Sequence, residues 1–139
     1  MLFRSDDGNT VGTLSYQQND VYIYRYSAGV WGTPVNINPA NAGSRDKETI
    51  ALSANGNVAM IGMPGDQVGC YASAGSIAFM EFSGGVWAQN GNLRSSPTIG
   101  SGNGFGRSIA MSEDGSSLDR KSTRLNSSHT DISRMPSSA

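Results

Sequence analysis

The sequence has few of the residues that build reactive or disulfide-bonded sites. Its 139 residues include one cysteine, Cys70, and one histidine, His129. A single cysteine excludes an internal disulfide framework and a metal site made of several thiolates. No apolar run approaches the ~18 residues of a membrane-spanning helix, and the stretch after Met1 lacks a signal-peptide core. The formal charge of −1 gives no electrostatic footprint for nucleic acid or a membrane surface.

The last 21 residues differ in composition from the rest of the chain. Residues 119–139 contain six serines and four basic residues, with no glycine and no aromatic residue. They show no apolar periodicity, which predicts a disordered tail.

This tail is also similar to translated sequencing adapter. Asp119–His129 matches the in-frame translation of a common short-read adapter, and Ser133–Ala139 matches its next portion in the same frame. We therefore interpret 119–139 as a non-native, adapter-derived tail and 1–118 as the natural polypeptide, whose gene we expect to continue beyond Leu118. Genomic DNA that encodes residues 119–139 would contradict this interpretation.

Without the tail, the chemistry available to the chain is narrower. Residues 1–118 carry six basic and nine acidic residues, a net charge of −3, and no histidine. The commonest general base and the commonest metal ligand are therefore missing from this part. Cys70 has no histidine to activate it, so we expect a packed or loop thiol. We predict no catalytic residue and no cofactor.

An internal repeat is the main positive feature of the sequence. Val21–Trp31 resembles Ile77–Trp87 at a spacing of 56, and Thr49–Gly56 resembles Ser108–Gly115 at a spacing of 59. A third copy of the Ser-x-Asp/Asn-Gly turn lies at Ser5–Asn9. The chain therefore spans about two repeats, which it enters and leaves part-way.

Each repeat is predicted to contain four short strands. Asp-Gly and Asn-Gly favour tight hairpins, because both central residues can take positive φ. Val58–Met63 is almost continuously apolar, as in a strand covered on both faces. No window has helical spacing, so we expect no helix. The other strands are expected at Val21–Tyr26, Thr49–Leu52, Ile77–Phe82, Val86–Gln89 and Ser108–Met111.

Tandem four-stranded units with glycine-rich turns are typical of a β-propeller. The small residues Ala51, Ser108 and Ala110 suit strands that crowd a central channel. Trp31 and Trp87 would fill the gaps between neighbouring sheets. The fold class expected is all-β, an incomplete propeller of about two four-stranded antiparallel blades.

The motifs resemble those of the FG-GAP repeat family, the blades of integrin-α-type propellers. Phe105–Leu118 is similar to the family pattern Phe-Gly-x-Ser-Val-Ala-Leu-Ser-x-Asp-Gly-x-x-Leu. Gly62–Asp66 resembles the Gly-Ala-Pro cassette, and Ser76–Gln89 resembles the aromatic strand followed by Ser-Gly-Gly-x-Trp-x-Gln. Asp46-Lys47 departs from the pattern, since Phe-Gly is expected there.

The resemblance implies an extracellular or cell-surface, non-catalytic binding or adhesion module. Its loops would meet a protein or carbohydrate partner, and further blades of the same propeller would complete it. One alternative is an accessory propeller of an extracellular hydrolase whose catalytic part lies outside this chain. Another is a purely structural repeat of a large surface protein.

Several residues have the chemistry of ligands, but their patterns fit structural roles better. The family's calcium loops place acids at alternate positions, whereas Asp66–Gly69 offers one carboxylate. The resemblance therefore does not extend to calcium binding, and no metal site is predicted. Asp6–Asn9 and Glu113–Gly115 fit turns better than calcium loops. Gly100–Gly106 lacks the Lys-Ser/Thr ending and the helix of a phosphate loop. The row Tyr22, Tyr24 and Tyr26 fits packing between blades, with sugar binding as the alternative.

Overall fold

A computed structural model gives the fold. It describes residues 2–15, 17–39, 47, 49–94, 101, 102 and 104–115, and the backbone of 117–121 and 131–134. All regular structure in these ranges is β-strand. The described residues contain no helix with the length and apolar character needed to cross a membrane.

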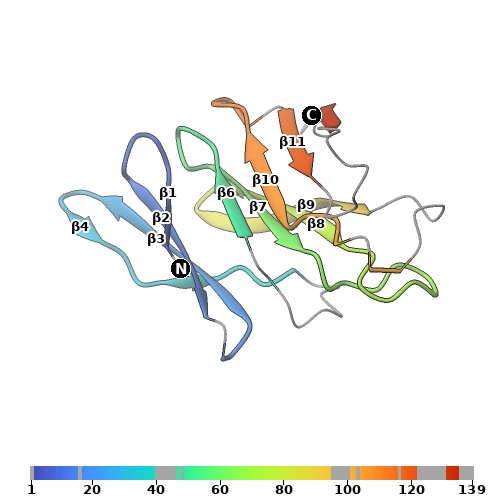
Figure 1. Ribbon diagram of the computed structural model, residues 1–139. Coiled ribbons are helices and arrows are strands. Elements are labelled where there is room, and N and C mark those ends of the chain that lie inside the picture. Colours follow the sequence, from blue (N-terminus) through green and yellow to red (C-terminus); the bar gives the residue numbers. More distant parts are fainter. Residues whose placement is uncertain are drawn as a thin grey trace.

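The strands form three antiparallel sheets that follow one another along the chain (Figure 1). Within each sheet, strands that are neighbours in sequence pair with one another, apart from β5, which returns to β3. The first sheet holds β1 (Leu2–Arg4), β2 (Thr10–Ser15), β3 (Asp20–Ser27), β4 (Val30–Trp31) and β5 (Val35–Asn36); the second holds β6 (Thr49–Leu52), β7 (Val58–Met63), β8 (Ser76–Ser83) and β9 (Val86–Arg94); the third holds β10 (Ser108–Met111), β11 (Ser117–Lys121) and β12 (Asp131–Arg134).

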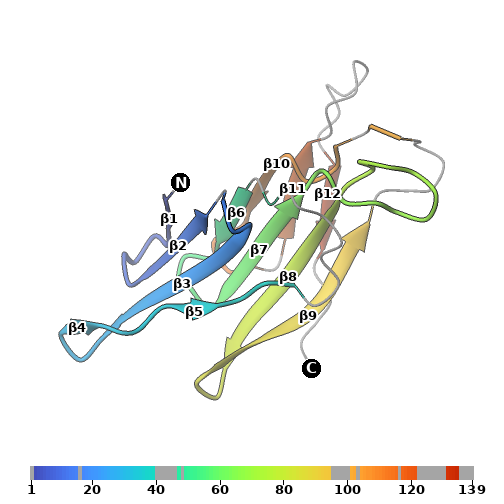
Figure 2. The ribbon, with the colours of Figure 1, turned by 90° about the horizontal axis from the view of Figure 1, so that it is seen from below.

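The second sheet is covered on both faces, as the apolar run in β7 predicts (Figures 1 and 2). Ala59, Ile61 and Met63 pack against the first sheet, whereas Met60 packs towards the third. All four side chains are fully buried. Because side chains alternate along a strand, a β7 with apolar residues at both phases can hold a sheet on each side.

Two hydrophobic clusters fill the two junctions between sheets. The buried residues of the first cluster, between the first and second sheets, are Leu14, Val21, Ile23, Ile37, Ile50, Ala59, Ile61, Met63, Ala78 and Met80. The second cluster contains Met60, Ile77, Phe79 and Phe105. The pair Tyr26–Trp31 in the first sheet is equivalent to Phe82–Trp87 in the second. Val21 and Ile23 are therefore equivalent in position to Ile77 and Phe79.

The three Ser-x-Asp/Asn-Gly turns share one hydrogen-bond pattern. In each turn the serine Oγ donates to the Asp or Asn side chain, at 2.6 Å from Ser5, 2.8 Å from Ser53 and 2.7 Å from Ser112. The glycine N–H then donates to the serine carbonyl. Backbone bonds from Asp7 N to Ala54 O and from Ala54 N to Glu113 O join the turns in a row.

The expectation of two positive φ angles in these turns is wrong. Only the glycines have positive φ, 74° at Gly8, 70° at Gly56 and 73° at Gly115. The preceding Asp or Asn keeps negative φ because its side chain is held by the serine hydroxyl, an arrangement typical of Asx turns. Turns with two positive φ angles occur instead at Ala28-Gly29 and Gly84-Gly85.

Part of the tail continues the third sheet. Strand β11 pairs with β10, with Ser108 opposite Lys121, and β12 pairs with β11. The structure thus has strands over 119–121 and 131–134, where the composition predicts disorder. Strand pairing uses backbone groups, so the open edge of β10 accepts a polar, serine-rich partner. The origin of the tail remains a prediction.

Candidate functional site

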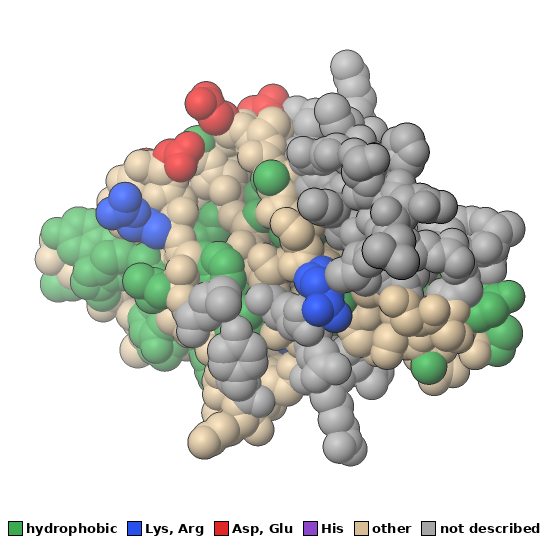
Figure 3. Space-filling view, in the orientation of Figure 1, with side chains coloured by type: hydrophobic (Ala, Val, Ile, Leu, Met, Phe, Trp, Pro, Cys, Tyr) green, Lys and Arg blue, Asp and Glu red, His purple; other side chains and the backbone are tan. Residues whose placement is uncertain are grey.

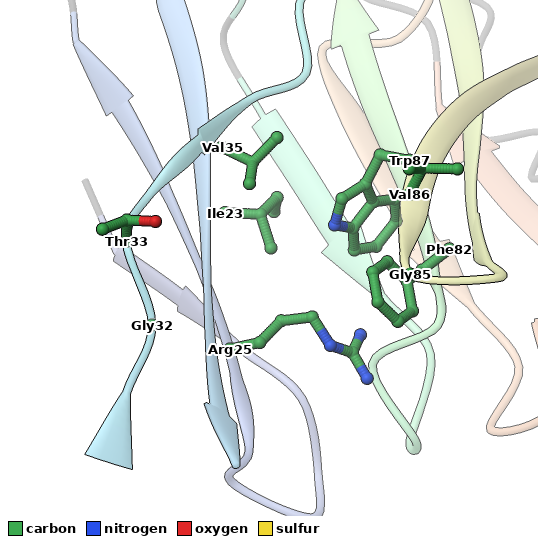
Figure 4. A pocket seen from close by; sticks show the side chains of 9 residues that line it. All are labelled: Ile23, Arg25, Gly32, Thr33, Val35, Phe82, Gly85, Val86 and Trp87. Atoms are coloured by element: carbon green, nitrogen blue, oxygen red, sulfur yellow. The ribbon is translucent and has the colours of Figure 1, made fainter.

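A groove of about 340 Å³ lies between the first and second sheets. The first sheet supplies one wall from β3 and the segment before β5, and the β8–β9 hairpin supplies the other (Figure 4). Most of the lining is apolar. The lining residues are Ile23, Arg25, Gly32, Thr33, Val35, Phe82, Gly85, Val86 and Trp87.

The groove is bounded on one side by an interrupted edge strand. Strand β4 pairs with β3 with Tyr26 opposite Trp31. Strand β5 also pairs with β3, but its register is shifted by one residue, with Ile23 opposite Val35. Residues 32–34 therefore face only two residues of β3, as in a β-bulge. Pro34 within this segment has no N–H to donate to a ladder, which favours an interruption at a sheet edge.

The opposite wall is an aromatic pair on the β8–β9 hairpin. The rings of Phe82 and Trp87 are 5.5 Å apart at 51°, a tilted contact that favours both rings. Trp87 is half-buried and packs against the first hydrophobic cluster. Val86 at the hairpin tip is 64% exposed, so the wall runs from the core to solvent. Trp87 thus fills the gap between sheets, as the sequence predicts.

Arg25 is the only charged residue among the described residues that line the groove. Its Nη1 donates to Gly56 O at 2.8 Å and its Nη2 donates to Asn57 Oδ1 at 2.9 Å. Its guanidinium carbon lies 4.0 Å from the centre of the Phe82 ring, a cation–π contact (Figure 4). Partial burial lowers the pKa of Arg25, which the nearby Asp7 opposes, although an arginine stays protonated. Among the described residues, no carboxylate forms a salt bridge with Arg25.

Arg25 was not singled out from the sequence, although a signal exists. It follows Val21 and Ile23 at alternate positions, so it extends their buried face. A cation at the end of an apolar face is unusual, because burying a charge is costly. The sequence does not show that Phe82 and Asn57, more than 30 residues away, receive this cation.

The other weighed residues have structural roles where they are described. Asp66 is 3% exposed and accepts a hydrogen bond of 2.6 Å from Ser76 Oγ, which ties the start of the loop to β8. Asp7 and Asp114 accept the serine bonds of their turns. Cys70 is an exposed loop thiol. The described residues hold no group of three His, Cys, Asp or Glu side chains placed for a metal ion.

The glycine-rich segment before β10 is described only in part. Phe105 is buried and bridges Gly75, and no helix follows it in the described residues. Gly100 and Asn103 lie outside the described residues. In the earlier repeat, Asp46 also lies outside them, but Lys47 is 5% exposed and its Nζ donates to Asn19 O.

The tyrosine row lies on the outer face of the first sheet. Tyr22 and Tyr24 are half-buried there, and Tyr26 is 42% exposed. Trp31 pairs with Tyr26 at 5.3 Å and is 50% exposed, so it fills no gap between sheets, unlike Trp87. Hydrophobic side chains gather at this end of the molecule (Figure 3). Acidic side chains gather along the edge that carries the turns (Figure 3).

The architecture defines an all-β protein of packed antiparallel sheets. No protein-family model matches the chain, and no curated protein matches it. Among solved structures, it is similar to a candidate 6-phosphogluconolactonase from Bacteroides fragilis, with a TM-score of 0.53 and 15% sequence identity. The match covers 95% of this chain and 36% of that chain, so this chain spans about a third of its neighbour's length. The similarity concerns the fold.

Proposed function

We propose that this chain is part of a β-propeller of FG-GAP type and acts as a non-catalytic binding module at the cell surface. The groove between the first and second sheets would hold the partner. The observation that carries this proposal is the lining of the groove, whose described residues are mostly apolar and include one cation but no His, Cys, Asp or Glu. Such a lining binds a ligand without offering a general base or nucleophile.

The recurring geometry supports the propeller. The same turn hydrogen bonds occur three times, and the same two-residue hairpin with an aromatic pair occurs twice. Each sheet turns the same face towards the next one, as Val21–Ile23 and Ile77–Phe79 illustrate. Repeating one junction in this way generates a ring when enough sheets follow.

A binding screen with two matched variants tests the binding role. The 139-residue protein would be presented to a glycan array and to a panel of displayed extracellular proteins. We expect a defined partner to be retained by the protein and by Trp31→Ser, but lost with Trp87→Ser. The two tryptophans hold equivalent positions in their hairpins, and only Trp87 lines the groove. An empty screen, or equal losses with both variants, would contradict the proposal.

The structural neighbour favours a second candidate, an enzyme or an enzyme's accessory propeller. That neighbour is a candidate 6-phosphogluconolactonase, although its identity to this chain is low. Hydrolysis of 6-phosphogluconolactone by the 139-residue protein, measured against the spontaneous rate, separates the two proposals. We expect no acceleration. An acceleration that rises with protein concentration would overturn the non-catalytic proposal.

A further inference from the structure

We propose that the groove recognises a carboxylate carried next to an apolar group, as in a partner protein that presents an acidic side chain beside an apolar one. Arg25 would bind the carboxylate, and the walls around Ile23, Val35 and Trp87 would cover the apolar group. This inference rests on the proposed function, because it names the chemistry of the partner at the same site.

Arg25 gives the groove its positive charge. Arg25 is half-buried, and no described carboxylate forms a salt bridge with it. Buried charges in proteins are normally paired, since desolvating an isolated ion is costly. Two of its N–H groups are used by Gly56 and Asn57, and the other donors remain for a ligand. A guanidinium fork fits a carboxylate through two parallel hydrogen bonds.

Arg25 is held in place before a ligand binds. The hydrogen bonds to Gly56 and Asn57 fix one edge of the guanidinium, and the Phe82 ring covers one of its faces. A cation held in this way loses little conformational entropy on binding. Phe82 and Trp87 come from the second sheet, so the junction between sheets assembles the site (Figure 4).

The two junctions between sheets differ at the position of Arg25. The position equivalent to Arg25 in the second sheet is Glu81, because Tyr26–Trp31 and Phe82–Trp87 are equivalent pairs. Glu81 accepts a hydrogen bond from Asn90 within its own sheet. The second and third sheets therefore pack with an acidic residue, and not a cation, at this position.

The lining favours an acidic protein side chain over a neutral sugar. Besides Arg25, the described lining residues supply two polar side-chain groups, the Thr33 hydroxyl and the Trp87 indole N–H. A sugar needs hydrogen-bond partners for several hydroxyl groups, whereas an apolar group needs only contact area. The volume of about 340 Å³ lies near the small end of ligand pockets and suits one or two side chains.

An NMR titration of the 139-residue protein with two isosteric probes tests this chemistry. The probes are 3-phenylpropionate, which carries an apolar ring and a carboxylate, and its neutral amide. We expect the carboxylate to bind about tenfold more tightly than the amide, and to shift the signals of Val35, Val86 and the Trp87 indole. With Arg25→Gln the two probes should bind equally, and Arg4→Gln, on an exposed strand, should leave the preference unchanged.

The outcomes separate this inference from the function on which it rests. Equal binding of both probes to the unmodified protein would overturn the carboxylate preference and leave a binding groove in place. Binding of neither probe at millimolar concentration would overturn both. Because the comparison of acid and amide uses the unmodified protein, it holds even if Arg25→Gln does not fold. A glycan partner from the binding screen, displaced by neither probe, would also overturn the inference.

Discussion

Gly8 and Gly56 hold the same place in two turns but differ in what surrounds them. Both have left-handed φ, 74° and 70°, which L side chains rarely adopt. A Cβ on Gly8 would meet nothing within 4 Å, whereas one on Gly56 would lie 2.1 Å from Thr10 Oγ1 and 2.5 Å from Thr10 Cβ. Thr10 is fully buried and has little room to move. The cost of substitution at Gly56 therefore combines backbone strain with overpacking.

We expect Gly8→Ala to lower the free energy of unfolding by about 1 kcal/mol, which is the cost of the left-handed conformation. Gly56→Ala should cost about 1–3 kcal/mol more, because the Thr10 side chain must shift. Urea unfolding of the two variants and the parent protein measures both values. Equal losses at the two positions would show that the Thr10 contact is unimportant.

The carboxylate of Asp20 makes part of the stability depend on pH. The Asn38 side-chain amide, followed by the Tyr22 hydroxyl, donates hydrogen bonds to Asp20 and lowers its pKa in the folded protein. A pKa below the unfolded value means that the stabilisation is present above the unfolded pKa of about 3.9 and is lost as the pH falls through the lower, folded value.

As the pH falls below about 5, the free energy of unfolding should therefore decrease less in Asp20→Asn than in the parent protein. The measurement is the urea midpoint as a function of pH for the parent and the variant. Asp6→Asn is the control, since Asp6 is exposed and makes no side-chain hydrogen bond within the described part of the chain. If Asp20→Asn and the parent had parallel pH profiles, the hydrogen bonds of Asp20 would not contribute.

At the scale of elements, the two aromatic hairpins form a natural comparison. Ala28 and Gly84 both occupy the first central turn position, with φ of 52° and 60°. Alanine is strained in this region, and a two-residue turn with two positive φ angles favours Asn-Gly or Gly-Gly. The first hairpin thus folds despite its local sequence, because Tyr26 and Trp31 pack across it.

We expect Ala28→Asn to stabilise the protein by about 0.5–1 kcal/mol and Gly84→Ala to destabilise it by a similar amount. Neither substitution introduces a steric contact, since Gly84 has nothing within 4 Å of its Cβ position and Ala28 is exposed. Thermal unfolding of the two variants beside the parent measures the opposite signs. Shifts of the same sign would mean that turn conformation does not control these hairpins.

Local pattern was sufficient to place six of the twelve strands in the described residues. Thr49–Leu52, Val58–Met63 and Ser108–Met111 form strands at their predicted bounds. The other predicted strands are longer than expected. Strand β9 continues to Arg94 through a bulge opposite Phe79, and the sequence gives no hydrophobic signal for this bulge. Strands β1 and β2 were among those not predicted, and the position of β1 depends on its pairing with β2.

At the scale of the molecule, the outer face of the first sheet is an exposed surface of aromatic side chains. Tyr26 and Trp31 correspond to Phe82 and Trp87, which the first sheet covers. Leu2, in β1 at the opposite edge of the same sheet, is 69% exposed. Exposed aromatic patches of this kind promote association.

We therefore expect the 139-residue protein to form small soluble oligomers, as measured by light scattering after size-exclusion chromatography. The double variant Tyr26→Ser with Trp31→Ser should shift it towards a monomer, because apolar area is removed from the exposed face. Val30→Ser, at the hairpin tip, is the control. A monomer with one cooperative calorimetric transition would count against this expectation.

The sequence by itself determined the all-β class, the turn positions and half of the strands, because alternation and turn-forming residues act over a few neighbouring positions. It also singled out Trp87 as a residue between sheets. The groove was decided only by the tertiary structure. Arg25, Asn57 and Phe82 meet because two sheets pack face to face, and contacts over 32 and 57 residues leave no local pattern. Tertiary structure also decided that Trp31, whose local sequence resembles that of Trp87, is exposed, because no described sheet covers its face.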